Sequence, residues 1–381
     1  MRLGDCGKTN LHTYSDKEKW SLIRYLDTGS ITEGRIDEIQ TLYPGVDKIP
    51  SRARRKASVG DILFSTVRPN QKHYGIIEAG TENLLVSTGF TVVTVDTTIA
   101  DPYFIYYYLT QSSVIESLQA IAEQSTSTYP SIKPSDIEDI ELDLPELETQ
   151  KKIGSTLRML DRKIALNEEI NDNLADLLQT IYQGRFGNDI LAVNQGVLSD
   201  ICSYSTDKVA VSELNVRTYF STENMLSGKA GSTEATSLPT TSQTTACHKG
   251  DTLISNIRPY FKKIVYCEDK CGCSTDVLCF TPSQPCYSAY LFSTLYADKF
   301  FAFMVAGSKG TKMPRGDKQQ IMTYPVVLPS EEELAGFNTI ASPLLEQIYS
   351  NRAENKRLSI LRDTLLPKLM SGEINVSAIQ L

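Results

Sequence analysis

The 381-residue sequence is poor in the features that enzymes and membrane proteins usually carry. It has three histidines and one tryptophan, and no apolar run approaches the ~18 residues that a membrane-spanning helix needs. His12, His73 and His248 do not show the spacing of metal ligands, and no G-x-S-x-G nucleophile motif occurs. We therefore expect a soluble binding protein that is not an enzyme. No signal peptide is visible, which predicts a cytoplasmic location.

Two partial motifs lack residues that their functions require. Gly7-Lys8-Thr9 ends like a phosphate-binding P-loop, but Arg2 stands where the first glycine of that motif is needed. Asp101-Pro102-Tyr103-Phe104 is similar to the loop of DNA amino-methyltransferases, yet it has one proline where that loop needs two. We therefore expect neither ATP binding nor a methyltransferase active site.

The eight cysteines are unevenly distributed. Seven lie between Cys202 and Cys286, with the spacing C-x3-C-x-C-x5-C-x6-C from Cys267 onward. This spacing contains none of the C-x2-C pairs that zinc sites use. We interpret these residues as reduced structural thiols and expect no metal; a metal bound in this stretch alone is the alternative.

One motif occurs twice in the chain. Residues 60–69 read GDILFSTVRP, and residues 250–259, which lie 190 positions later, read GDTLISNIRP. Further landmarks recur at an offset of 184, among them Pro130 with Pro314 and Asn167 with Asn351. Half of the chain is about 190 residues, so the sequence indicates an end-to-end duplication. It predicts two similar units related by a pseudo-twofold axis.

Each repeat begins with a mixed segment and ends with a long helix. In the first repeat, residues 61–64, 74–77 and 90–95 have the composition of strands, and residues 101–122 form an apolar stretch of helical length. The predicted fold class is therefore α+β, with two mixed α/β globular domains. A heptad pattern follows from residue 146, and a helix over 146–183 would be roughly 57 Å long at about 1.5 Å per residue.

The heptad positions of the two helical segments predict that these helices pair. Apolar residues and asparagines follow at steps of four and three, which is typical of a coiled-coil seam. The predicted helix-pairing seam consists of Leu160, Ile164, Asn167, Asn171, Leu174, Leu344, Ile348, Asn351, Asn355 and Leu358. A buried asparagine costs stability but selects one register, so we expect the two helices to pack on each other as a coiled coil. The pseudo-twofold relation of the repeats predicts that they are antiparallel. Asparagines at a solvated edge of the seam are the alternative. Pro343 predicts that the second helix divides into residues 331–341 and 343–370.

Basic residues gather at comparable places in the two repeats. The net charge of −8 does not exclude nucleic acid as a partner, because salt confines electric fields to about 8–10 Å and local basic patches still act. Loops rich in Lys, Arg, Ser, Thr and Gly suit phosphate contacts. The candidate DNA-binding residues are Arg52, Arg54, Arg55, Lys72, Lys133, Lys262, Lys263, Lys309, Lys312 and Arg315. For any single cluster a solvated surface is the alternative, and Arg68 and Arg258 could instead hold the turn before their prolines.

In this order and duplication, the motifs resemble the specificity subunits of type I restriction-modification enzymes. The resemblance rests on G-D-[IT]-L-x-S-x-[VI]-R-P at 60 and 250, on STGF at 87–90 and STDV at 274–277, and on Leu-Pro before each long helix. The closing segment 365–374, LLPKLMSGEI, is also similar to that family's C-terminus. The similarity extends over almost the whole chain.

The resemblance implies a division of labour along the chain. Target-recognition domains at 1–145 and 185–329 would each bind one half of a bipartite DNA sequence. Conserved helical spacers at 146–184 and 330–381 would set the gap and dock methyltransferase subunits. The implied partners are double-stranded DNA, two methyltransferase subunits and restriction motor-nuclease subunits. This chain would be non-catalytic and hold no cofactor; S-adenosylmethionine would belong to the methyltransferase, and ATP and Mg to the motor subunit. The rival function is a protein-interaction scaffold that docks partners on the paired helices without binding DNA.

Overall fold

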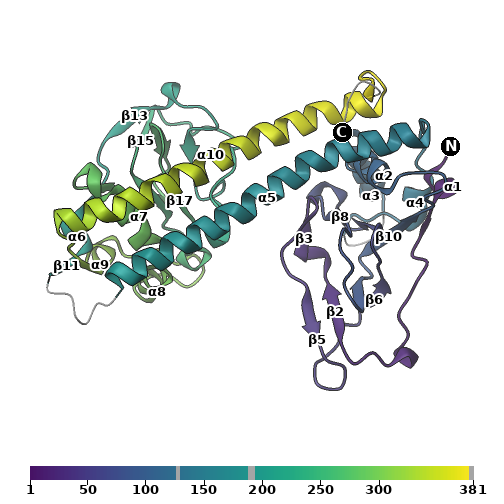
Figure 1. Ribbon diagram of the computed structural model, residues 1–381, viewed down its shortest axis with the longest axis horizontal. Helices are drawn as coiled ribbons and strands as arrows, with labels where there is room; N and C mark the ends of the chain where they lie inside the picture. Colours follow the sequence, from purple (N-terminus) through teal and green to yellow (C-terminus); the bar gives the residue numbers. More distant parts are fainter. Residues whose placement is uncertain (126–128, 188–193, 377–381) are drawn as a thin grey trace. The chain divides into compact units, whose positions relative to one another are not determined.

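The computed structural model describes residues 1–125, 129–187 and 194–376. Contacts divide the chain into two units: unit 1 comprises Met1–Ala165 with Asn355–Leu381, and unit 2 comprises Leu166–Glu354. Two helices of 40 residues, α5 (Leu147–Phe186) and α10 (Glu331–Met370), contribute to both units (Figure 1). Among the described helices, none is long and apolar enough to cross a membrane.

The described residues of unit 1 form two four-stranded sheets and a short hairpin. The first sheet is antiparallel, in the order β1 (Gly7–Thr9), β10 (Phe90–Val95), β7 (Ile62–Ser65), β8 (Tyr74–Ile76). The second has the order β5 (Gln40–Leu42), β2 (Ile23–Leu26), β9 (Leu84–Ser87), β6 (Ala53–Lys56), with β2 and β9 parallel. The hairpin consists of β3 (Ile31–Thr32) and β4 (Arg35–Ile36). The shorter helices are α1 (Leu3–Cys6), α2 (Pro102–Leu109), α3 (Ser112–Glu123) and α4 (Pro134–Glu138).

Unit 2 has the same kinds of elements. Its antiparallel sheet has the order β12 (Cys202–Tyr204), β19 (Val277–Pro282), β16 (Thr252–Ser255), β17 (Ile264–Tyr266). A second sheet has the order β13 (Lys208–Ala210), β15 (Gln243–Cys247), β18 (Cys271–Cys273), β14 (Tyr219–Phe220). A third pairs β11 (Gln195–Val197) with β20 (Pro325–Val327). The shorter helices are α6 (Leu198–Ile201), α7 (Ser288–Tyr296), α8 (Asp298–Ala306) and α9 (Lys318–Met322).

The internal repeat is visible in the first sheet of each unit. The strand order β1-β10-β7-β8 of unit 1 corresponds to β12-β19-β16-β17 of unit 2. The duplicated GD motif forms the inner strands β7 and β16, whose residues are buried throughout because both faces of each strand are covered. The two mixed α/β parts and the two long helices confirm the predicted α+β class.

One end of each long helix packs into the hydrophobic core of each unit. In unit 1, Ile153 and Leu157 of α5 pack in the same cluster as Leu366 and Leu369 of α10. In unit 2, Tyr182 and Phe186 of α5 pack against Phe337 of α10, with ring centroids 6.4 and 5.5 Å from it. A fully buried side chain of this size contributes about 1.5–3 kcal/mol, so these anchors hold each helix end firmly in its unit.

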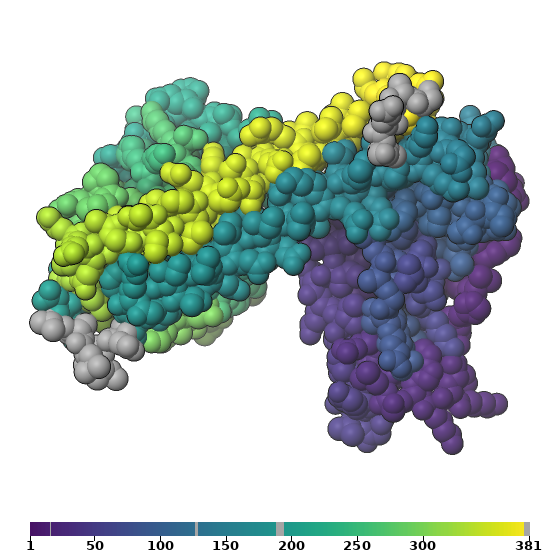
Figure 2. Space-filling model, viewed as in Figure 1, coloured from purple at the N-terminus to yellow at the C-terminus, as the bar shows by residue number. Residues whose placement is uncertain are grey.

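The two long helices are antiparallel. In unit 1, Arg362 Nη1 lies 2.7 Å from Asp161 Oδ1, and Asn355 Nδ2 donates to the Ile164 carbonyl at 3.1 Å. In unit 2, Asn167 bonds Glu354 and Asn351 bonds Asn171. Partner numbers on α10 fall as numbers on α5 rise, which confirms the predicted antiparallel pairing; Figure 2 shows α10 in yellow along α5 in teal.

The predicted break at Pro343 is wrong, because α10 runs without interruption from Glu331 to Met370. Pro343 and Thr339 both lie on the exposed side of the helix. The Thr339 carbonyl receives no hydrogen bond from position 343, because proline has no N–H. That carbonyl can be hydrated instead. Ala341 and Leu345 are buried on the opposite side and keep both segments on one axis.

Candidate nucleic-acid interface

The duplicated motif forms one tight turn in each unit. We define the motif turn as residues 67–72 in unit 1 and 257–262 in unit 2. Each turn follows the motif strand and contains a short 3-10 helix, η3 (Pro69–Gln71) or η6 (Pro259–Phe261). Arg68 and Arg258, which precede the prolines, have φ of 49° and 50°, and Lys72 and Lys262 have φ of 57° and 51°. This left-handed conformation is unfavourable for residues with side chains, so both copies maintain the same strained backbone.

A second loop docks on each motif turn. We define the companion loop by its described residues, 129–133 in unit 1 and 307–316 in unit 2. The Arg68 amide donates to the Pro130 carbonyl at 3.0 Å, and the Arg258 amide donates to the Pro314 carbonyl at 2.8 Å. Val67 pairs with Ser131, and Ile257 pairs with Arg315, as isolated β-bridges. Backbone bonds thus join two loops that carry basic residues and are far apart in the sequence.

These contacts bring together two sets of predicted DNA-binding residues. In unit 1 the motif turn carries Lys72 and the companion loop carries Lys133, which is exposed and precedes α4. In unit 2, Lys262 and Lys263 belong to or adjoin the motif turn, and the companion loop carries Lys309, Lys312 and Arg315. The motif turn and the companion loop therefore both contribute residues to the basic surface of unit 2.

Several of these basic side chains form exposed ion pairs. Lys72 lies 2.5 Å from Glu33, Lys309 lies 2.5 Å from Asp317, and Arg315 lies 3.0 Å from Asp276. Lys262 and Lys229 both reach Asp298, and their hydrogen bonds lower the pKa of its carboxyl. Exposed pairs contribute about 0–1 kcal/mol each, so a phosphate group could replace these carboxylates at little cost.

Two of the predicted residues are used inside the fold. The Arg55 guanidinium donates to Asn10 Oδ1 and to the Phe90 carbonyl, and burial lowers its pKa. Lys263 Nζ donates to the Thr222 carbonyl at 2.6 Å, and burial lowers the pKa of this lysine as well. These contacts make both less available for phosphate than their exposed neighbours.

The remaining basic residues of unit 1 lie on another sheet. Arg54 is part of β6, and Arg52 directly precedes that strand and is exposed. The Arg52 carbonyl accepts from the Thr88 amide at 2.9 Å, and the Arg54 carbonyl accepts from Tyr14 at 2.7 Å. Because β6 belongs to the sheet β5-β2-β9-β6 and the motif turn follows β7 of the other sheet, we treat Arg52, Arg54 and Arg55 as a separate group.

Exposed aromatic residues lie beside the basic loops, and the sequence did not identify them as candidate site residues. Tyr260 and Phe261 in the motif turn of unit 2 are 48% and 38% exposed, with ring centroids 4.7 Å apart. In unit 1 the Arg68 guanidinium lies 5.4 Å from the ring centroid of Tyr129, which is 58% exposed. The signal that could have found Tyr260 and Phe261 is their position inside the duplicated motif, where the first copy has Asn70 and Gln71.

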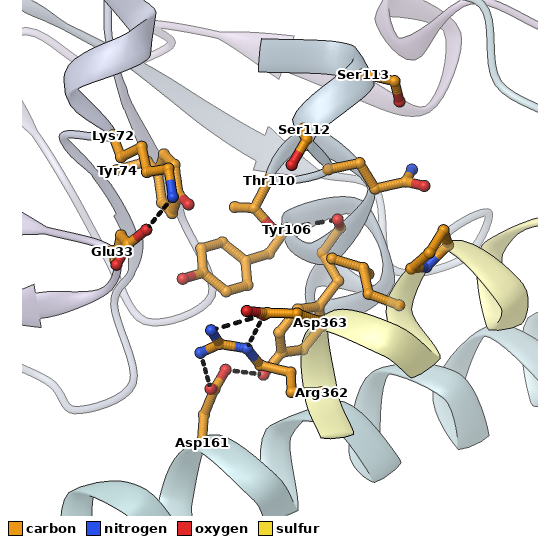
Figure 3. Close-up of a pocket in the computed structure, with 14 residues that line it drawn as sticks. Glu33, Lys72, Tyr74, Tyr106, Thr110, Ser112, Ser113, Asp161, Arg362 and Asp363 are labelled. Atoms are coloured by element: carbon orange, nitrogen blue, oxygen red, sulfur yellow. Dashed lines mark hydrogen bonds and ion pairs between the residues drawn. The ribbon is translucent and has the colours of Figure 1, made fainter. Parts of the chain in front are cut away.

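A cavity of about 320 Å³ lies within unit 1 between the motif turn and the ends of the long helices (Figure 3). Lys72 and Glu33 line one side, and Arg362 and Asp161 line the other. Tyr107 donates to Asp161 at 2.6 Å, and burial raises its pKa well above the usual range for tyrosine. The charged groups of this cavity bond one another, which suits a structural network rather than acid–base catalysis.

The four asparagines of the predicted helix-pairing seam form hydrogen bonds between α5 and α10. Asn167, Asn171 and Asn351 are 1%, 7% and 6% exposed, and Asn355 is partly buried. Asn167 donates to Glu354 at 2.7 Å, and Asn351 donates to Asn171 at 2.9 Å. The apolar seam residues Leu160, Ile164, Leu174, Leu344, Ile348 and Leu358 are buried or half-buried.

The clustered cysteines lie in the core of unit 2. Cys247, Cys267, Cys271, Cys273 and Cys279 share one buried cluster, and all eight cysteines are free thiols. Cys267 and Cys271 have sulfurs 3.5 Å apart. Among the described residues, no group of three or more His, Cys, Asp or Glu side chains is arranged to hold a metal ion.

The chain is similar to specificity subunits of type I restriction enzymes. Residues 53–175 match the family described as the type I restriction modification DNA specificity domain. The chain is 28% identical over 209 residues to the type I restriction enzyme HindI specificity subunit of Haemophilus influenzae, covering 55% of this chain and 45% of that protein. It is 23% identical over 378 residues to the type I restriction enzyme MjaIX specificity subunit of Methanocaldococcus jannaschii, covering 83% and 78%. The chain thus spans less than half of the HindI subunit's length.

A solved structure has a similar fold. It is the S subunit of a type I restriction-modification system from M. genitalium, with a TM-score of 0.56 and 18% sequence identity. The match covers 97% of this chain and 95% of that one. At this identity the likeness shows the fold alone, and the fold extends over both units.

Proposed function

This chain belongs to the specificity subunits of type I restriction-modification enzymes, and on that premise we propose that each of its two globular parts binds one half of a bipartite double-stranded DNA target. The observation that carries the proposal is the duplicated motif turn with its docked basic loop. Two copies of one binding element in one chain suit a target that is itself in two parts. The same backbone bonds, Arg68 to Pro130 and Arg258 to Pro314, support an equivalent role for both copies.

The basic residues would act mainly on the phosphate backbone. Phosphate contacts supply position and affinity, whereas base contacts supply sequence preference. In unit 2, Lys262, Lys309, Lys312 and Arg315 would form the phosphate-contacting surface. Their carboxylate partners would be displaced when phosphates bind.

The long helices would dock the methyltransferase subunits. Leu166, Ile170 and Leu177 of α5 are 50%, 36% and 47% exposed. Leu166 and Ile170 each stand one position before a seam asparagine, and Leu177 stands one position before the buried Leu178. The three therefore form a stripe about 100° around the helix from the seam. An exposed apolar stripe at heptad spacing fits a partner helix. The gap between half-sites would follow from the length of the paired helices.

The remaining assignments complete the proposal. This chain would be the non-catalytic recognition component, acting in the cytoplasm with methyltransferase and restriction motor subunits. S-adenosylmethionine would be bound by the methyltransferase partner, and ATP and Mg by the motor partner.

Comparing the methylated sequences of host DNA with and without the gene tests this function. We expect a motif of two half-sites with a fixed gap that depends on the gene, and a two-part protection footprint with the methyltransferase present. A scaffold without DNA recognition would change neither. Loss of the gene with no change in methylated motifs and no footprint would overturn the proposal.

A further inference from the structure

The two motif turns differ where they are most exposed. Residues 68–72 read RPNQK and residues 258–262 read RPYFK, so the arginine, proline and lysine are the same and the middle pair differs. Asn70 and Gln71 are exposed in unit 1, as Tyr260 and Phe261 are in unit 2. We call these two residues the tip pair of each turn.

The frame around each tip pair has the same geometry. The amide of the second tip residue donates to the arginine carbonyl at 2.9 Å in both units, and the lysine amide donates to the proline carbonyl at 2.9 Å in both units. Pro69 and Pro259 are buried beneath the tips. The arginine and the lysine are left-handed in both copies. A strained backbone that recurs at equivalent positions is held by its surroundings and presents its tip in one orientation.

The tip pair of unit 2 is unusual for a surface turn. Tyr260 and Phe261 together expose two adjacent aromatic rings to water. Lys263 Nζ lies 6.0 Å from the Phe261 ring centroid, and the docked companion loop carries Met313, which is 51% exposed. Exposed apolar side chains surrounded by basic residues are typical of surfaces that contact nucleic acid bases while lysines contact phosphates.

The tip pair of unit 1 has a different chemistry on the same frame. Asparagine and glutamine amides can bond the adenine edge through one donor and one acceptor, which apolar side chains cannot do. Aromatic side chains instead make apolar contacts with thymine methyl groups or stack on bases. One frame with two chemistries is what two halves of an asymmetric target require.

We propose that the tip pairs are base-reading positions: Asn70 and Gln71 contact adenine edges in one half-site, and Tyr260 and Phe261 make apolar contacts with bases in the other. This inference rests on the proposed function and deepens it by naming residues that distinguish the half-sites. The arginine, proline and lysine that both copies share form the frame. The tip pair supplies sequence preference.

The test uses the full chain in its host, with methylated motifs as the readout. The variants are N70A/Q71A, Y260A/F261A and the control Tyr43→Ala, an aromatic residue 52% exposed outside both motif turns. Each double variant should relax at least one base position in one half-site by about 10- to 100-fold and leave the other half-site and the gap unchanged. The control should leave the motif as it is.

The outcomes separate this inference from the proposed function. A wild-type gene without a bipartite motif would contradict the proposed function itself. A bipartite motif unchanged by both double variants would overturn the tip-pair inference alone. The reciprocal exchanges N70Y/Q71F and Y260N/F261Q, which give each turn the tip pair found in the other copy, guard against misfolding. If a variant with an unchanged melting temperature loses affinity for every sequence equally, the tips make sequence-independent or protein contacts and the inference is wrong.

Discussion

Asn351 donates its side-chain amide to Asn171 at 2.9 Å across the paired helices, and both residues are buried. Gln347 in turn donates to Asn351 at 2.7 Å, which completes a short polar chain within an otherwise apolar seam. A slip of the helices by one turn would bury these amides without partners. The polar chain therefore selects one register of α5 against α10.

Replacing Asn351 with leucine should destabilise the protein by about 1–3 kcal/mol, because Asn171 would remain buried without this donor. The double variant N171L/N351L should recover most of that loss, since both polar groups are removed together. Denaturant unfolding measures the difference. The control is Asn173→Leu, which changes an exposed asparagine of α5 two positions from Asn171. Equal stability of Asn351→Leu and the wild type would show that the pair does not restrain the seam.

Neutralising the companion loop of unit 2 should weaken DNA binding and its dependence on salt. In the assembled complex, K309Q/K312Q/R315Q should flatten the slope of log affinity against log salt by about two to three units, because each phosphate contact releases counterions. The control K208Q/K249Q/K270Q removes the same charge from exposed positions elsewhere in unit 2. An unchanged slope in the first variant would remove this loop from the interface.

Asp298 should reduce the DNA affinity of unit 2 by pairing with two of its lysines. Its carboxylate lies 2.7 Å from Lys229 and 2.9 Å from Lys262, so Asp298→Asn would free both ammonium groups. We expect tighter DNA binding at low salt and a salt slope steeper by up to about one unit. Glu213→Gln, which breaks the exposed pair with Lys270, should have no such effect. Weaker binding in Asp298→Asn would indicate that the aspartate orients the lysines for DNA.

The motif aspartate of unit 2 should make stability depend on pH. Burial raises the pKa of the Asp251 carboxyl above 3.8, although the His248 amide donates to it at 2.8 Å and Cys279 contacts it at 3.3 Å. Because the pKa of Asp251 is higher in the folded state, the contribution of this residue to stability is complete below about pH 3.8. That contribution is lost as pH rises through the folded-state pKa. Asp251→Asn should remove this fall in melting temperature, which begins as pH rises above about 3.8. The exposed Asp207→Asn should retain it, and a fall that persists in Asp251→Asn would assign it to another group.

The apolar stripe on α5 should be required for assembly. The variant L166Q/I170Q/L177Q should lose copurification of the methyltransferase, because a partner helix would no longer bury these side chains. Its melting temperature should change little, since the three residues are exposed. L11Q/Y43Q/V46Q removes exposed apolar residues outside the long helices and should assemble normally. Full assembly of the stripe variant would place the docking surface elsewhere.

Periodicity and repetition, which are local properties, allowed much of the fold to be predicted from the sequence. The heptads predicted a first long helix over 146–183, and α5 extends over Leu147–Phe186. The duplicated motif predicted similar units, and the sheets of β7 and β16 share one strand order. Pro343 misled the prediction because a proline's effect depends on whether its side of the helix is hydrated.

The candidate interface depended on tertiary structure. Charge along the sequence gave Arg55 and Lys309 equal weight, yet Arg55 donates to Asn10 and Phe90 while the Lys309 side chain is 80% exposed. The exposure of Tyr260 and Phe261 was equally invisible, because apolar residues in a sequence predict a core by default.

The duplication, the element types and the residues able to pair the long helices could be predicted because they follow from spacing along one chain. Tertiary contacts establish which loops meet, which basic side chains reach solvent and which residues stand at the tips of the motif turns. Backbone bonds such as Arg258 to Pro314 join segments more than fifty positions apart, and no local pattern encodes them. Burial, in turn, is a property of the packed units.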